Sequence, residues 1–193
     1  MDITRDKEEI QSRIGQKRMD HVLRVADYAK DLAVHYGLDP EKAYLAGFYH
    51  DCMKIRDLDL LKKAARDLGL EWTEEFDQAP QVVHGLLGAL AAEKMYGVRD
   101  RDILNAIAYH TTGRAGMTDL EKIIYLADYA EPMRDFDGVD QVRKEIKEDL
   151  DQAMYQALNR TIQYLIEKNS YITIKSLEAR NDFLKKVTHG KIY

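Results

Sequence analysis

The chain has 193 residues, of which 45% are hydrophobic and 33% are charged, as in a globular protein with a sizeable core. Its formal net charge is −5, which argues against a general nucleic-acid binder, because such proteins usually carry a basic excess. No apolar run approaches the ~20 residues that span a bilayer, and the N-terminal sequence MDITRDKEEI lacks the apolar segment of a secretory signal. With one cysteine, Cys52, we expect a cytoplasmic protein without membrane or nucleic-acid partners.

Apolar residues recur with helical spacing along most of the chain. The first strong pattern covers residues 17–36, and Asp39-Pro40 then reads as the cap and first residue of a second helix. Residues 171–174 are the only strand-like stretch, which we expect to be an extended connector because it lacks a partner. The sequence therefore predicts an all-α fold. Further helices are expected at 57–68, 82–96, 100–110, 118–131, 139–168 (one helix or two) and 176–187.

Four of the six histidines lie on or beside the apolar stripe of an expected helix: His21, His50, His84 and His110. Any single one of them is more readily explained as a satisfied core histidine. Four such histidines together with Asp51 and Asp128 are costly to bury unless a metal ion takes their nitrogen and oxygen atoms as ligands. His35 and His189 are expected to be surface or terminal residues.

The order His21, His50-Asp51, Asp128 places each part on a different expected helix, so that the site would form only when the helices pack. This H…HD…D pattern resembles the HD-domain metal-dependent phosphohydrolases. Three segments resemble the bacterial HD-domain symmetrical bis(5′-nucleosyl)-tetraphosphatases more narrowly. They are RMDHVLRVADYAKDLAVHYGLDPEKAYLAGFYHDCMK at 18–54, VVHGLLGA at 82–89 and HTTGRAGMTDLEKIIYLADYAEPMR at 110–134. The chain departs from the family pattern at Cys52, Met53, Met133 and Asp137, none of which is an expected ligand.

The resemblance implies a single HD-domain helical bundle over residues 1–193, with a core at 15–140, a C-terminal helical extension at 141–193 and the metal site between helices. It implies symmetric cleavage of diadenosine tetraphosphate into two ADP molecules. It also implies iron as one or two ions, with manganese or another divalent metal as the alternative. The ligands would be His21, His50, Asp51 and Asp128, while His84 and His110 would hold a second ion or face the phosphate. Asp51, His84 and His110 are the residues expected at the catalytic centre.

Several cations and hydroxyls near these segments are candidates for phosphate contact, each with a simpler explanation as an ordinary helix end or connector. Arg18 precedes His21 by one helical turn and Lys54 follows His50 by one turn. Thr111 follows His110 directly, and Arg134 could neutralise charge on the leaving phosphate. In the segment YITIKS at 171–176, Tyr171 could stack on a base and Lys175 could approach phosphate. Cys52 is expected to be a buried packing residue.

The expected reaction is in-line attack of an activated water on a central phosphorus, with no general base assigned. Two rival functions stay open. One is an HD phosphohydrolase of deoxynucleotides or guanosine polyphosphates, and the other is a catalytically silent nucleotide-binding scaffold. Cyclic-dinucleotide hydrolases of this class usually carry a GYP tripeptide, which this sequence lacks. A homodimer is the expected assembly.

Overall fold

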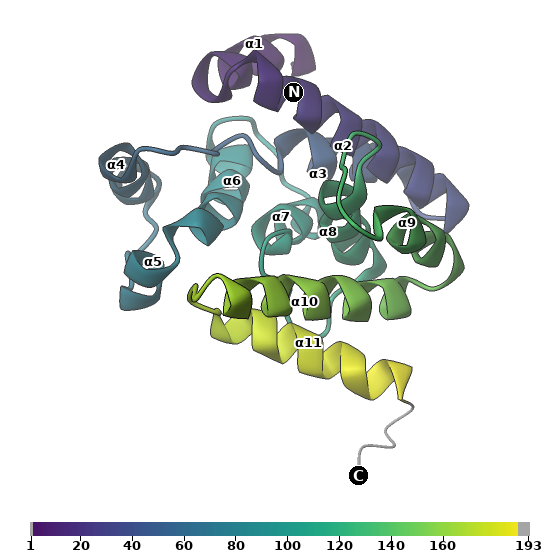
Figure 1. Ribbon diagram of the computed structural model, residues 1–193. Coiled ribbons are helices and arrows are strands. Elements are labelled where there is room, and N and C mark those ends of the chain that lie inside the picture. Colours follow the sequence, from purple (N-terminus) through teal and green to yellow (C-terminus); the bar gives the residue numbers. More distant parts are fainter. Residues whose placement is uncertain (1, 189–193) are drawn as a thin grey trace.

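The computed structural model describes residues 2–188 (Figure 1). Over this range it contains eleven α-helices, one 3-10 turn and no strand, which confirms the predicted all-α class. The helices are α1 (Ile3–Ile14), α2 (Gln16–His35), α3 (Pro40–Tyr49), α4 (Leu58–Leu68), α5 (Glu74–Gln78), α6 (Val83–Lys94), α7 (Arg101–Tyr109), α8 (Asp119–Ala130), α9 (Val139–Glu148), α10 (Leu150–Glu167) and α11 (Ile174–Val187), and the 3-10 turn η1 covers Pro80–Val82.

The expected helix ends lie within two residues of the observed ones, but α1 and α5 were not expected, and the choice left open at 139–168 is decided. Helices α1 and α5 were not expected, because α1 is rich in charged residues and α5, with 5 residues, is too short to show a period. Residues 139–168 form two helices, since Asp149 has extended backbone angles and its side chain caps α10. The connector is non-helical at 171–173, but Ile174 already begins α11.

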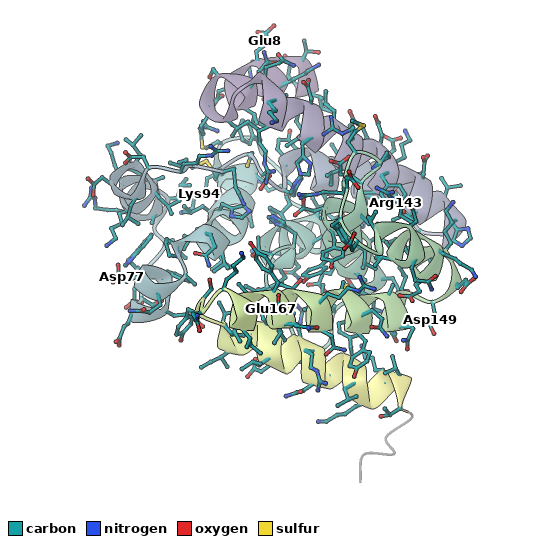
Figure 2. The ribbon with its side chains drawn as sticks, viewed as in Figure 1. Glu8, Asp77, Lys94, Arg143, Asp149 and Glu167 are labelled. Carbon is teal, nitrogen blue, oxygen red and sulfur yellow. The ribbon has the colours of Figure 1, made fainter. Side chains whose placement is uncertain are left out.

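Helices α7 and α8 lie at the centre of the molecule, between α2 and α3 on one side and α10 and α11 on the other (Figure 1). Helices α4 and α5 lie at one flank and α9 at the opposite flank. Charged side chains such as those of Glu8 on α1 and Asp77 on α5 project at the periphery (Figure 2). Polar groups carried inward by the central helices must therefore find partners inside the fold.

Two glycines allow the helices that carry the site to pack closely. A Cβ atom at Gly47 of α3 would lie 2.7 Å from Cα of Ala26 on α2. A Cβ atom at Gly85 of α6 would lie 2.8 Å from the carbonyl oxygen of Ala108 on α7. Because real Cβ atoms do not approach so closely, a larger residue at either position would push apart the helices beside His50 and His84.

Within residues 2–188, each helix is too short or too polar to cross a bilayer. His35 lies at the surface, with Nε2 2.8 Å from the carbonyl oxygen of Lys147. His189 lies outside the described residues. The organisation of residues 1–193 as one domain stays a prediction.

Candidate metal centre

Six polar residues that the sequence singled out meet in the middle of the helical core. Helix ends supply two of them, because His50 follows the last residue of α3 and His110 follows the last residue of α7. Three overlapping groups each bring their ligand atoms within 4.8 Å of one another. Five of the residues are buried, and the Asp128 side chain is 20% exposed. We call these residues the metal cluster: His21 on α2, His50 and Asp51 after α3, His84 on α6, His110 after α7 and Asp128 on α8.

Backbone carbonyls fix the tautomer of three cluster histidines. In each case Nδ1 faces the carbonyl oxygen three residues earlier in the chain. A carbonyl oxygen only accepts, so Nδ1 carries the proton and Nε2 keeps a free lone pair. These lone pairs point to the same interior space, as metal ligands require. The three Nδ1–oxygen distances are 2.6 Å for His50 and Gly47, 2.7 Å for His84 and Gln81, and 2.7 Å for His110 and Ile107.

Glu131 orients the fourth histidine. Nδ1 of His21 lies 3.1 Å from Oε1 of Glu131, and Nε2 lies 3.0 Å from Oδ1 of Asp128. Burial raises the pKa of Glu131, but hydrogen bonds from Arg24, the Met133 amide and His21 lower it to about 2. Glu131 therefore stays a carboxylate that accepts a hydrogen bond from Nδ1–H of His21 and leaves Nε2 turned toward the cluster.

At the centre of the cluster, histidine Nε2 atoms and the carboxylate oxygens of Asp51, all hydrogen-bond acceptors, lie close to one another. Neither carboxylate oxygen of buried Asp51 has a hydrogen-bond partner of acceptable geometry, and Nε2 of His50 has none either. Nε2 of His84 lies 3.0 Å from Oδ1 of Asp51 and 3.1 Å from Nε2 of His110. Burial lowers the pKa of His84 to about 4, so its ring is neutral at neutral pH. Lone pairs this close need a shared cation, and the imidazole and carboxylate donors fit a divalent metal ion.

A cavity of about 530 Å³ opens onto the cluster. His84, His110 and Asp128 form part of its wall, so a ligand in the cavity would reach the metal ligands directly. The remaining wall is largely aromatic and comes partly from α10 and the segment before α11. Of the predicted phosphate-contact and base-contact residues, Lys54, Thr111, Arg134 and Tyr171 line this cavity. The aromatic residues of the wall are Tyr125, Tyr129, Phe136, Tyr164 and Tyr171.

Three predicted cations lie at the rim of the cluster. Arg18 forms an ion pair with Asp51, and Nζ of Lys54 lies 3.0 Å from Nε2 of His84. Arg134 donates from Nη2 to Oδ1 of Asp128 over 2.7 Å. Burial lowers the pKa of Lys54, and the nearby charge of Arg18 adds to this effect. These cations offer charge to an anionic ligand beside the metal.

Lys175 is not brought to the cavity. Its side chain is directed to Tyr109, with Nζ 5.8 Å from the centre of that ring. Thr173 of the connector and Ser176 in the first turn of α11 line the cavity instead, so they contribute hydroxyls beside Tyr171.

Sequence reasoning missed the residues that hold the ligands in place. Glu131 follows Asp128 by three positions and Arg24 follows His21 by three, so helical spacing was the available signal. Arg143 on α9, labelled in Figure 2, donates to three carbonyl groups of the segment that carries Glu131 and Arg134. No local pattern in the sequence indicated this contact, because it joins two helices through a long side chain.

Comparison with known proteins agrees with this geometry. The HD domain family model matches residues 18–133. The symmetrical bis(5′-nucleosyl)-tetraphosphatase of Bacillus subtilis is 40% identical over 160 residues, which cover 83% of this chain and 86% of that protein. The protein of the same name from Halalkalibacterium halodurans is 38% identical over 175 residues, which cover 91% and 93% of the two chains.

A crystal structure from Clostridium acetobutylicum has the same fold. It is described as a predicted HD superfamily hydrolase involved in NAD metabolism, and it superposes with a TM-score of 0.92 at 39% identity, covering 96% of this chain and 98% of that one. The family match includes all six residues of the metal cluster. This chain belongs to the HD-domain family, in the branch that contains the symmetrical bis(5′-nucleosyl)-tetraphosphatases of B. subtilis and H. halodurans.

Proposed function

We propose that this chain hydrolyses diadenosine tetraphosphate at its central linkage and releases two ADP molecules. One observation carries the proposal: a buried histidine and aspartate cluster, in which Nε2 of His50 and both carboxylate oxygens of Asp51 make no hydrogen bond, opens onto a cavity with cations at its rim and aromatic rings in its wall. The activity named for the relatives of similar length supports the choice of substrate. Cytoplasmic location and a homodimer are parts of the same proposal.

The proposed metal ligands are His21, His50, Asp51 and Asp128. Asp51 belongs to two of the three ligand groups, one with His21 and His50 and the other with His84 and His110. This sharing supports two ions bridged by Asp51, with iron as the ion that the family resemblance implies. A bound divalent ion would lower the pKa of a water molecule and polarise a phosphoryl oxygen.

The cations at the rim would bind and orient the polyphosphate. Arg134 is held on Asp128 by its side-chain and backbone oxygens, at 2.7 Å and 2.9 Å, so its charge has a fixed position beside the cluster. Lys54 borders both His84 and the cavity. We propose that these two residues offset charge on the leaving phosphate and that Arg18 and the Thr111 hydroxyl help to place the phosphate chain.

The aromatic wall would bind a nucleoside. Tyr171 is 40% exposed and lines the cavity, so one face of its ring is available for stacking on adenine. Stacking contacts of this kind discriminate little between different bases. Cleavage at the central linkage would instead depend on the length of the phosphate chain between the nucleoside and the metal.

A substrate panel tests the proposal. Metal-loaded protein would be supplied with diadenosine tetraphosphate, a deoxynucleoside triphosphate and a guanosine polyphosphate, and kcat/KM would be measured for each. We expect diadenosine tetraphosphate to have the highest kcat/KM. Preference for either of the others would establish the rival phosphohydrolase function, and no turnover of any of them would support the silent scaffold.

A further inference from the structure

A second, smaller cavity also borders the metal cluster. Its volume is about 290 Å³, near the lower end of small-molecule sites. It shares Lys54, Gln81 and His84 with the larger cavity, so both open on the same edge of the cluster. The larger cavity extends toward α10 and α11, whereas the smaller one extends toward α4. The rest of its lining is Ile55, Arg56, Leu58, Leu61 and Pro80.

The part of the small cavity that it does not share with the larger one is apolar except for the cation Arg56. Leu61 is buried, but Leu58 is 44% exposed although it is a large apolar residue. Exposed leucine at the mouth of a concave site is favourable when a ligand covers it. Arg56 is exposed at the same cavity and Lys54 lies at its junction with the cluster, so a phosphorylated ligand would meet positive charge there.

Given the proposed function, we propose that this small cavity binds the second nucleoside of a dinucleoside tetraphosphate. A substrate cut at its centre has one nucleoside diphosphate on each side of the cleaved linkage. With one nucleoside on the aromatic wall of the large cavity, the other needs an apolar site that starts from the same edge of the cluster. The small cavity meets this requirement, with Lys54 and His84 between the two halves.

A third cavity, which at about 760 Å³ exceeds even the one we call the large cavity, does not meet the requirement. It shares Tyr129, Phe136, Thr161 and Tyr164 with the large cavity, but no residue of the metal cluster lines it. It therefore enlarges the aromatic end of the large cavity and offers no second approach to the metal. The half of the substrate that extends toward α4 would therefore place its nucleoside in the small cavity.

Binding of ADP, which is the proposed product, tests the assignment without turnover. We expect the metal-loaded protein to bind two ADP molecules per chain in equilibrium dialysis. Leu58→Asn should weaken one of the two sites about tenfold, because it removes apolar contact at similar size and unchanged charge. Leu60→Asn is the matched control, since Leu60 is 57% exposed on the same helix and does not line the small cavity.

The same variants separate this assignment from the proposed function. KM for diadenosine tetraphosphate should rise about tenfold in Leu58→Asn, and Leu60→Asn should match the wild type. One ADP per chain in the wild type, or two unweakened ADP sites in Leu58→Asn, would overturn the assignment. Loss of the proposed function would instead appear as no hydrolysis of diadenosine tetraphosphate by the wild-type protein. Equal melting temperatures would show that both variants fold.

Discussion

The two walls of the large cavity differ in how exposed their side chains are and in how firmly contacts hold them. The metal wall (His84, His110 and Asp128) is part of the cluster, where backbone carbonyls and buried carboxylates fix each ring. The opposing aromatic wall includes Tyr164 and Tyr171, which are 58% and 40% exposed. Removing one member of a buried, coupled network is expected to impair metal binding by the other members as well. Removing one half-exposed aromatic side chain is expected to remove only its own contact with the substrate. Substitutions should therefore separate metal binding and turnover from substrate affinity.

The largest effect is expected from Asp51→Ala. This change removes a carboxylate that two ligand groups share, so the protein should lose most of its bound metal and turnover should fall on the order of a thousandfold or more. Metal analysis of the purified variant and its initial rate are the measurements. Asp31→Ala, on the exposed face of α2, is the control and should behave as the wild type. Undiminished turnover in Asp51→Ala would remove Asp51 from the list of essential ligands.

Arg134→Ala should reduce kcat about a hundredfold while the protein keeps its metal. Arg134 contacts Asp128 from outside the cluster and is 37% exposed, so the ligands keep their other contacts when it is removed. The lost charge is the one proposed to stabilise the leaving phosphate. The control is Arg101→Ala, because Arg101 is 76% exposed and pairs with Glu93. A fall in metal content equal to the fall in rate would make Arg134 a structural support instead.

Glu131→Gln should weaken metal binding about tenfold to a hundredfold, as is usual for a group that orients a ligand. The amide keeps a hydrogen-bond acceptor but loses the charge that favours the orientation of His21. Competition with a chelator of known affinity measures the change. Arg24→Gln should have a smaller effect, since Arg24 contacts Glu131 and not the histidine. Equal effects of the two changes would indicate that the ion pair, and not the His21 contact, matters.

The smallest effect is expected at the aromatic wall. Tyr171→Leu should raise KM about fivefold, near the lower limit for loss of base stacking, with kcat and metal content unchanged. Ile174→Ala is the control, because Ile174 is 62% exposed nearby and does not line the cavity. A change in kcat alone would contradict a role for Tyr171 in nucleoside binding.

The sequence predicted the metal wall better than the aromatic wall, and the reason is physical. Histidines and aspartates on apolar helical stripes are conspicuous, because burying them needs a partner, and the structure brings all six together. Tyr164 and Phe136 look like ordinary packing residues in the sequence. The packing of α10 against α8 brings Tyr164 to the cavity, and the segment after α8 brings Phe136 there. Lys175 shows the opposite case: it follows Tyr171 by four positions in the sequence, but its Nζ lies over the Tyr109 ring and it does not line the cavity. The contacts of Arg143 could not be predicted either, since its carbonyl partners lie 9 to 13 residues earlier, beyond the three- and four-residue spacing of a helix.

Helix boundaries followed local chemistry where a cap or breaker was present. Thr118 and Glu121 form a capping box at the start of α8, close to the expected position. The prediction left residues 139–168 open as one helix or two, because a single non-helical residue leaves the apolar spacing almost unchanged, and the cap at Asp149 decides for two.

The most direct test of the account compares hydrolysis of diadenosine tetraphosphate by metal-stripped and metal-restored wild-type protein, with the nucleotide products separated by chromatography. The account predicts that ADP is the only nucleotide product and that it forms only after the ion is restored. Formation of ATP together with AMP, or an equal rate in the stripped protein, would contradict it.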